Sequence, residues 1–166
     1  MSEALEFLND LFAKAKKAGA DAADGHHVVS QSLSTSMRMG KREDLERSES
    51  LDMMLRVFIG QRQACVASSD TSAQAMEELV ERAVSMAKVA PEDPYCGLAP
   101  EDRLAKKWPD LDLFDDYEYD TEALYGIAAE TEEAALAVDG VTNSNGAGAG
   151  WSSAEVAIAT SHGFAG

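Results

Sequence analysis

Hydrophobic residues recur at three- and four-residue spacing in three stretches of the chain, a period typical of helices that bury one face. Each stretch begins with a residue suited to capping a helix, namely Ser2, Thr71 or Asp120. Gly19 and Pro91 follow the first two stretches and favour their termination. The pattern therefore predicts helices over residues 2–18, 71–90 and 120–140.

Between the first two helices the period changes to two, which predicts extended strands. We expect four strands, over residues 27–39, 42–47, 51–59 and 62–69, joined as an antiparallel meander. The second is densely charged, which favours an edge position where charges discourage pairing with a neighbour. In the third, Leu55 and Val57 share one face while Met54 and Phe58 share the other, which indicates burial on both faces.

The rest of the chain is predicted to contain one long connection and one more β region. All four prolines lie within residues 91–119 together with many acids, a composition that favours a long, partly ordered connection. Residues 141–145 and 154–161 are expected to form a final β-hairpin. The predicted fold class is therefore α+β, a mainly antiparallel sheet with helices covering one face, in a single domain over residues 1–166. Leu55, Val57, Leu79 and Val80 are expected to be nearly inaccessible.

Composition and charge narrow the classes of partner. The chain has 166 residues, a mass of 17.7 kDa and a formal net charge of −16. Affinity for nucleic acid and for anionic membranes comes largely from Lys and Arg, so we expect neither partner. The first residues lack the basic and apolar parts of a secretory signal, and no apolar run of about 18 residues occurs. We therefore expect a soluble cytoplasmic protein with its two cysteines reduced.

The residues that most often bind metals or act as nucleophiles do not form a known motif here. His26 and His27 are adjacent in a predicted strand and point to opposite faces, while His162 is expected to be a polar turn residue. Neither a His-Glu-x-x-His pair nor a Gly-x-Ser-x-Gly turn is present. Cys65 is expected to be a small core residue, and Cys96 has only acids nearby in sequence, so we expect no activated thiolate.

Two further stretches carry groups that bind ligands in other proteins. Gly146, Gly148 and Gly150 are interpreted as a flexible hairpin connection, because no phosphate-binding pattern and no following helix accompanies them. The acids of residues 110–120 lack the spacing of a calcium-binding loop and favour a solvated acidic loop. The residues therefore predict no catalytic, cofactor-binding or metal-binding position, and by themselves they leave open whether the chain is an enzyme.

Several short motifs occur in one order along the chain, at residues 15–23, around Gly40, and at residues 57–62, 67–70, 92–99, 142–144 and 161–164. In this order they resemble the N-terminal domain of the PmbA/TldD family. Asp93-Pro94-Tyr95-Cys96-Gly97-Leu98 and Ser161-His162-Gly163-Phe164 look like the PmbA (TldE) branch of that family. The resemblance covers essentially the whole chain.

Members of this family are described as modulators of DNA gyrase and as cytosolic zinc-dependent peptidases that work as a TldD–TldE pair. The resemblance implies that zinc is held in the C-terminal domain of a TldD-like partner, by a His-Glu-x-x-x-His helix that is not found in this sequence. It also implies that this chain is the N-terminal, non-catalytic part of a PmbA/TldE-like subunit, without the C-terminal domain. Its partners would be a TldD-like subunit or a second copy, and an unfolded peptide would be the substrate of the full assembly.

Two functional hypotheses remain beside each other. In the first, an exposed strand edge of such a domain holds an unfolded peptide by strand addition. In the second, the chain is an acidic protein-interaction module that binds a basic partner and has no role in proteolysis. An independent small enzyme is disfavoured because no catalytic motif is found. We also expect the edge of the last strand to be unpaired and to promote self-association as salt rises.

Overall fold

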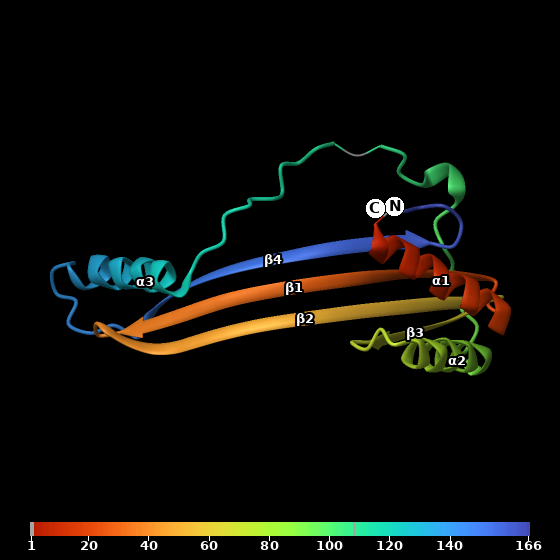
Figure 1. Ribbon diagram of the computed structural model, residues 1–166, viewed down its shortest axis with the longest axis horizontal. Helices are drawn as coiled ribbons and strands as arrows, with labels where there is room; N and C mark the ends of the chain where they lie inside the picture. The colour runs from red at the N-terminus through yellow and green to blue at the C-terminus, as the bar shows by residue number, and fades with distance from the viewer. Residues whose placement is uncertain (1, 108) are drawn as a thin grey trace. The chain divides into compact units, whose positions relative to one another are not determined.

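The computed structural model describes residues 2–107 and 109–166, so that Met1 and Trp108 lie outside the described residues. The chain divides into two compact units. Unit 1 comprises residues 1–29, 50–109 and 155–166, and unit 2 comprises residues 30–49 and 110–154. Strands β1 (Ala22–Arg38), β2 (Lys41–Ile59) and β4 (Ala147–Thr160) contribute to both units, whereas β3 (Arg62–Ser68) belongs to unit 1. The strands form one antiparallel sheet in the order β3-β2-β1-β4 (Figure 1).

Unit 1 is built around two helices on one face of its part of the sheet (Figure 1). Helix α1 (Glu3–Ala18) begins at Ser2, whose hydroxyl accepts a hydrogen bond from the backbone of Leu5, and ends at Gly19 in the left-handed conformation. Helix α2 (Ala73–Val89) packs against α1 and β3. The predicted core is confirmed, since four residues from β2 and α2 are at most 4% exposed: Leu55, Val57, Leu79 and Val80.

Unit 2 contains the third helix, α3 (Thr121–Leu136), which begins at the predicted cap. The Asp120 carboxylate accepts a hydrogen bond of 2.8 Å from the backbone of Ala123. The helix covers one face of the unit's part of the sheet, where Tyr125 and Ala128 pack with Met37 of β1. A short 3-10 helix, η1 (Glu101–Arg103), lies in the long connection of unit 1.

The expected meander has three strands instead of four. Residues 42–47 and 51–59 belong to the single strand β2, because the sequence between them contains no Gly or Pro that would turn the chain. The densely charged residues 42–47 do lie at an edge of the sheet, as expected. β3 pairs only with Met53 to Ile59, so the first half of β2 has no partner strand on that side. The fourth strand of the sheet is β4, which pairs with β1.

The final β-hairpin also differs from the expectation. Residues 141–145 are not a strand, and β4 extends as one strand from Ala147 to Thr160. The hairpin forms later, because the chain turns at Gly163 and its last residues pair back onto β4. Ile158 and Gly166 exchange two backbone hydrogen bonds of 2.7 and 2.9 Å. The expectation that the end of this strand is unpaired is therefore wrong for its last three residues.

Candidate functional site

Another chain could add a strand beside β3, beside β4, or beside the unpartnered first half of β2, where dense charge discourages pairing. The edges at β3 and β4 differ. At the β3 edge, the two-residue turn between Ile59 and Arg62 makes these two residues a hydrogen-bonded pair. The pairing alternates along an antiparallel ladder, so the backbone groups of Gln63, Cys65 and Ala67 point away from β2, toward the outer side.

The β3 edge is closed at both of its ends. A guanidinium nitrogen of Arg82, on α2, donates a hydrogen bond of 3.2 Å to the carbonyl of Ala67. At the other end, the backbone of Asp93 donates a hydrogen bond of 2.7 Å to the carbonyl of Gln61. Only a short segment around Gln63 and Cys65 stays accessible between these contacts, too short for stable strand addition.

At the even-numbered residues of β4, the backbone N–H and C=O groups point away from β1, toward the outer side of the sheet. Ile158 and Thr160 bond to the returning tail on the outer side, whereas the backbone of Ser161 donates a hydrogen bond of 2.7 Å to the carbonyl of Ala23 on β1. The contact of Gly150 with Ser34 has the same β4–β1 register as the hydrogen bond of Ser161 with Ala23. No bulge between these two points therefore reverses the alternation. The even positions therefore face away from β1 along the strand.

Four of these positions lie in unit 2, and we call them the β4 edge: Gly148, Gly150, Ser152 and Ala154. Among the described residues, none donates or accepts a backbone hydrogen bond to them from the outer side. The stretch contains no Pro and no charged side chain, which are the usual devices that protect an edge from pairing. The β4 edge is therefore a candidate site for an added strand.

The long connection is tied to β4 near this edge. The indole N–H of Trp151 donates a hydrogen bond of 3.0 Å to the carbonyl of Tyr117. The rings of Tyr117 and Tyr119 meet edge to face with their centroids 4.6 Å apart. This part of the connection is therefore fixed beside β4 by one side chain, without forming a strand of its own.

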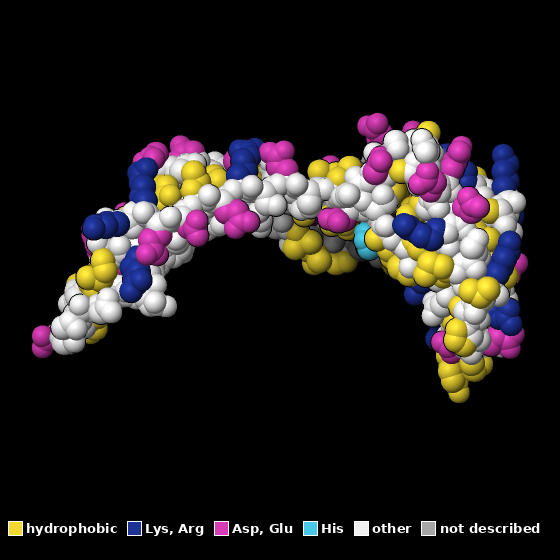
Figure 2. Space-filling model, turned by 90° about the horizontal axis from the view of Figure 1, so that it is seen from below, with side chains coloured by type: hydrophobic (Ala, Val, Ile, Leu, Met, Phe, Trp, Pro, Cys, Tyr) yellow, Lys and Arg dark blue, Asp and Glu magenta, His cyan; other side chains and the backbone are white. Residues whose placement is uncertain are grey.

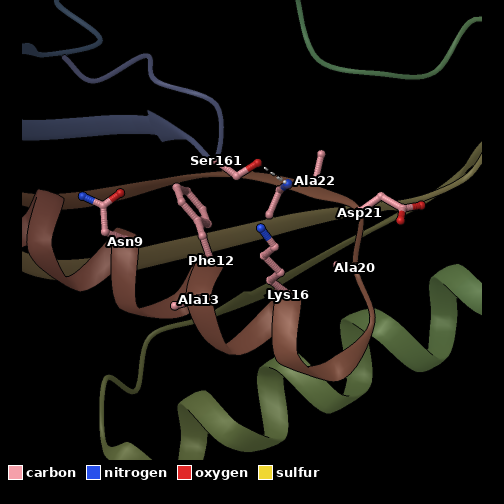
Figure 3. Close-up of a pocket in the computed structure, with 9 residues that line it drawn as sticks. Asn9, Phe12, Ala13, Lys16, Ala20, Asp21, Ala22 and Ser161 are labelled. Carbon is pink, nitrogen blue, oxygen red and sulfur yellow. Dashed lines mark hydrogen bonds between the residues drawn. The ribbon is translucent and has the colours of Figure 1, made fainter.

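A pocket of about 240 Å³ lies between α1 and the start of β1, within unit 1. Phe12 and Lys16 project from the helix, and the hydroxyl of Ser161 accepts a hydrogen bond of 2.9 Å from the backbone of Ala23 (Figure 3). The carboxylate of Asp21 at its border accepts a hydrogen bond from the backbone of Gly60. These groups can contact a small ligand, but they include no base placed to activate the serine.

The histidines do not converge. His27 lies against Phe7 of α1, with ring centroids 5.6 Å apart, in a groove of about 360 Å³ in unit 1. The Nε2 of His162 lies 2.6 Å from the carbonyl of Ala99, so His162 holds the long connection beside the end of β4. Within residues 2–107 and 109–166, no group of three or more His, Cys, Asp or Glu is placed to hold a metal ion. These residues therefore do not fit a zinc site.

The structure agrees with the prediction for the acidic stretch and differs from the predictions for Cys65 and for two of the three glycines. Cys65 is exposed and not a core residue, because it alternates with the buried Ala64 and Val66 and points to the opposite face of β3. The acids of residues 110–120 lie in an irregular, exposed connection. Gly148 and Gly150 lie inside β4 and not in a hairpin connection, and a side chain at Gly148 would lie 3.2 Å from the carbonyl of Thr35.

One buried carboxylate was missed by the sequence reasoning. Glu132 of α3 is 2% exposed, and its two oxygens accept hydrogen bonds of 2.8 Å from the backbone of Met39 and Gly40 in the β1–β2 turn. The Gly40 bond, with help from the Ser144 hydroxyl, lowers the pKa of Glu132 below its usual value. The available signal was spacing, since Glu132 follows Ala128 by four residues on the buried face of the helix.

Comparison with known proteins identifies the family. Residues 27–87 match the sequence model of PmbA/TldA metallopeptidase domain 1. A protein of Haemophilus influenzae named metalloprotease PmbA homolog is 34% identical over 148 residues, which cover 89% of this chain. The chain belongs to the PmbA/TldD family. It spans only 32% of the length of the Haemophilus protein.

Two solved structures have the same fold as this PmbA/TldD chain. A protein of Bacteroides thetaiotaomicron described as a modulator of DNA gyrase aligns with a TM-score of 0.89 at 20% identity, over 100% of this chain and 38% of its own. TldE from Thermococcus kodakarensis aligns with a TM-score of 0.79 at 18% identity, over 96% of this chain and 36% of its own. In the part of the chain that the structure describes, no helix is long and apolar enough to cross a membrane.

Proposed function

We propose that this chain is the N-terminal, non-catalytic part of a PmbA/TldE-like subunit of a cytosolic TldD–TldE-type metallopeptidase, and that its β4 edge holds an extended segment of a substrate polypeptide. Family membership supports the first half of the proposal. Zinc and the cleaving residues are expected in a TldD-like partner, since the described residues here do not fit a metal site.

The contrast between the two sheet edges carries the second half of the proposal. The β3 edge is closed by Arg82 and Asp93, whereas the β4 edge offers backbone groups at four alternate residues. Strand addition uses these groups and depends little on the sequence of the added segment. A subunit that presents unfolded polypeptides to a peptidase needs this tolerance.

A binding assay with paired variants tests the strand-addition half. Ser152→Pro removes an outward N–H without removing a bond to β1, whereas Ser152→Ala removes only the hydroxyl. We expect a labelled ten-residue extended peptide to bind the unaltered chain and the Ser152→Ala variant, and to lose binding to Ser152→Pro. Circular dichroism checks that both variants fold. Equal binding to all three proteins would contradict strand addition at β4.

A metal and activity assay tests the non-catalytic half. We expect the chain alone to retain no stoichiometric zinc after dialysis and to cleave neither casein nor short peptides. One tightly bound zinc per chain, together with cleavage that a chelator stops, would overturn this half of the proposal. If the chain binds a basic protein but no extended peptide, the function would be that of an acidic interaction module.

A further inference from the structure

Much of the negative charge of the chain lies in the part of the sequence that contains the β4 edge and the connection leading to α3. Residues 110–154 contain eleven Asp and Glu and no Lys or Arg, although the whole chain has 14 basic residues. Five of these acids lie in the connection that leads to α3: Asp110, Asp112, Asp115, Asp116 and Glu118. In the rest of the sequence acidic residues are interspersed with basic ones. Both kinds of charge occur on the face drawn in Figure 2.

The acids of the connection are not neutralised within the protein. Asp110 and Asp115 accept hydrogen bonds from backbone N–H groups two residues later, which leaves their negative charge in place. Among the described residues, none of the five forms an ion pair, whereas Glu122 at the start of α3 pairs with Arg42. Exposed carboxylates of one sign at this density create a local negative potential.

This acidic stretch lies beside the β4 edge, which carries no charged side chain, unlike the unpartnered first half of β2. Trp151, which alternates with the edge residues Gly150 and Ser152, holds the carbonyl of Tyr117 at 3.0 Å from its indole nitrogen. Tyr117 follows directly after Asp116 and precedes Glu118. A strand added at β4 would lie about 4.8 Å from its backbone, so side chains of that strand would enter the negative potential of the connection.

We propose that the β4 edge selects extended polypeptide segments that carry Lys or Arg at alternate positions, with the acidic connection as the source of the selectivity. The inference rests on the proposed function and adds the class of segment to it. Backbone hydrogen bonds at Gly148, Gly150, Ser152 and Ala154 hold any extended segment. The carboxylates of Asp112, Asp116 and Glu118 raise the association rate of basic segments and slow that of acidic ones.

Three matched peptides measure this selectivity. Each has ten residues with blocked ends and alternates Thr with Lys, Ser or Glu. Fluorescence anisotropy with the 166-residue chain at low salt is expected to rank the affinities Lys, Ser, Glu, with about tenfold or more between the first and the last. Because the selectivity is electrostatic and exposed, about 0.3 M salt is expected to bring the three affinities together.

Two charge variants locate the effect. Replacing Asp112→Asn, Asp116→Asn and Glu118→Gln together is expected to remove most of the preference for Lys over Glu. A control that changes the net charge equally, Glu6→Gln with Glu77→Gln and Glu81→Gln on the exposed faces of α1 and α2, is expected to keep it. If both triple variants lose the preference equally, it reflects net charge only and the inference is overturned.

The Ser152→Pro variant separates this inference from the proposed function. Loss of all three peptides in that variant, with the Lys peptide preferred by the unaltered chain, supports both. If Ser152→Pro abolishes binding but the unaltered chain binds the three peptides equally, strand addition stands and the selectivity is overturned. If the Lys peptide binds Ser152→Pro as well as the unaltered chain, its binding is charge adhesion without an added strand, which overturns both.

Discussion

Units 1 and 2 share three strands but are stabilised differently. Among the described residues, the core of unit 1 contains nineteen buried hydrophobic residues from two helices and all four strands. The cluster in unit 2 contains three, which are Met37, Tyr125 and Ala128. The half of β2 that lies in unit 2 is exposed along its whole length. The same strands therefore lie under a thick apolar layer in one unit and a thin one in the other.

Polar contacts replace part of the missing apolar area in unit 2. Glu132 holds the β1–β2 turn, the Tyr125 hydroxyl donates a hydrogen bond of 2.9 Å to the carbonyl of Asp44, and Arg42 lies over the Tyr125 ring. Arg42 also forms a two-point ion pair with Glu122. The exposed contacts among these, such as the Arg42–Glu122 pair, contribute less than core burial, so unit 2 is expected to open locally more easily. The β4 edge lies in this more weakly packed unit, where adding a strand would extend a thinly covered sheet.

The largest expected effect comes from deleting a buried side chain of unit 1, compared with a partly exposed one of unit 2. Leu79→Ala in α2 removes a side chain that is 1% exposed, and we expect a loss of about 2–5 kcal/mol in unfolding free energy. Ile127→Ala in α3, where the side chain is 42% exposed, is expected to cost less than about 1 kcal/mol. Denaturant titration measures both. A change below about 0.5 kcal/mol for Leu79→Ala would mean that this helix face is not core.

A close approach of backbones makes the next largest difference. At Gly25 in β1, an added Cβ would lie 2.6 Å from the carbonyl oxygen of Met54 and 3.3 Å from a methyl group of Leu8. Gly25→Ala therefore forces the strand or α1 to shift, and we expect a loss of about 1–3 kcal/mol in unfolding free energy. Thermal unfolding followed by circular dichroism measures it. An unchanged midpoint would show that α1 can move away without cost, contrary to the tight packing of unit 1.

Glu132 makes unit 2 sensitive to acid. The Gly40 N–H lowers the pKa of this carboxyl below its usual 4.5. The carboxylate therefore stabilises the folded protein fully above about pH 4.5, and this stabilisation is lost as the pH falls through the lower pKa of the folded state. We expect the Gly40 amide resonance to titrate with a midpoint below 4.5, and Glu132→Gln to remove this titration and lower the melting temperature. Glu130→Gln, at an exposed neighbouring position, is the control and should change neither. A midpoint at or above 4.5 would contradict the stabilisation of the charged Glu132 by hydrogen bonds from the β1–β2 turn.

The contrast between the units also explains what the sequence could predict. The helices and the core around Leu55 and Leu79 follow from periodicity, because in unit 1 burial repeats with the period of each element. In unit 2 the β2 residues are exposed on both faces, so no alternation indicated that residues 41–50 continue the strand. Pairing of β4 with β1 joins segments more than a hundred residues apart in the sequence. The hydrogen bonds of Glu132 to the β1–β2 turn likewise join residues that are far apart in the sequence. Neither leaves a local signal.

The smallest expected effect has the opposite sign and lies in α3. Gly126 is exposed in the interior of this helix, and an added Cβ there would meet no atom within 4 Å. Since glycine loses more backbone entropy than alanine when a helix forms, Gly126→Ala is expected to stabilise α3 by about 0.5–1 kcal/mol. Hydrogen exchange of the α3 amides is the sensitive measurement, because it reports local opening of unit 2 separately from global unfolding. Slower exchange confined to α3, with unchanged exchange in α1 and α2, would show that the two units open separately. Equal slowing in all three helices would show that they open together, and the division into a firmly packed and a weakly packed unit would then have no energetic counterpart.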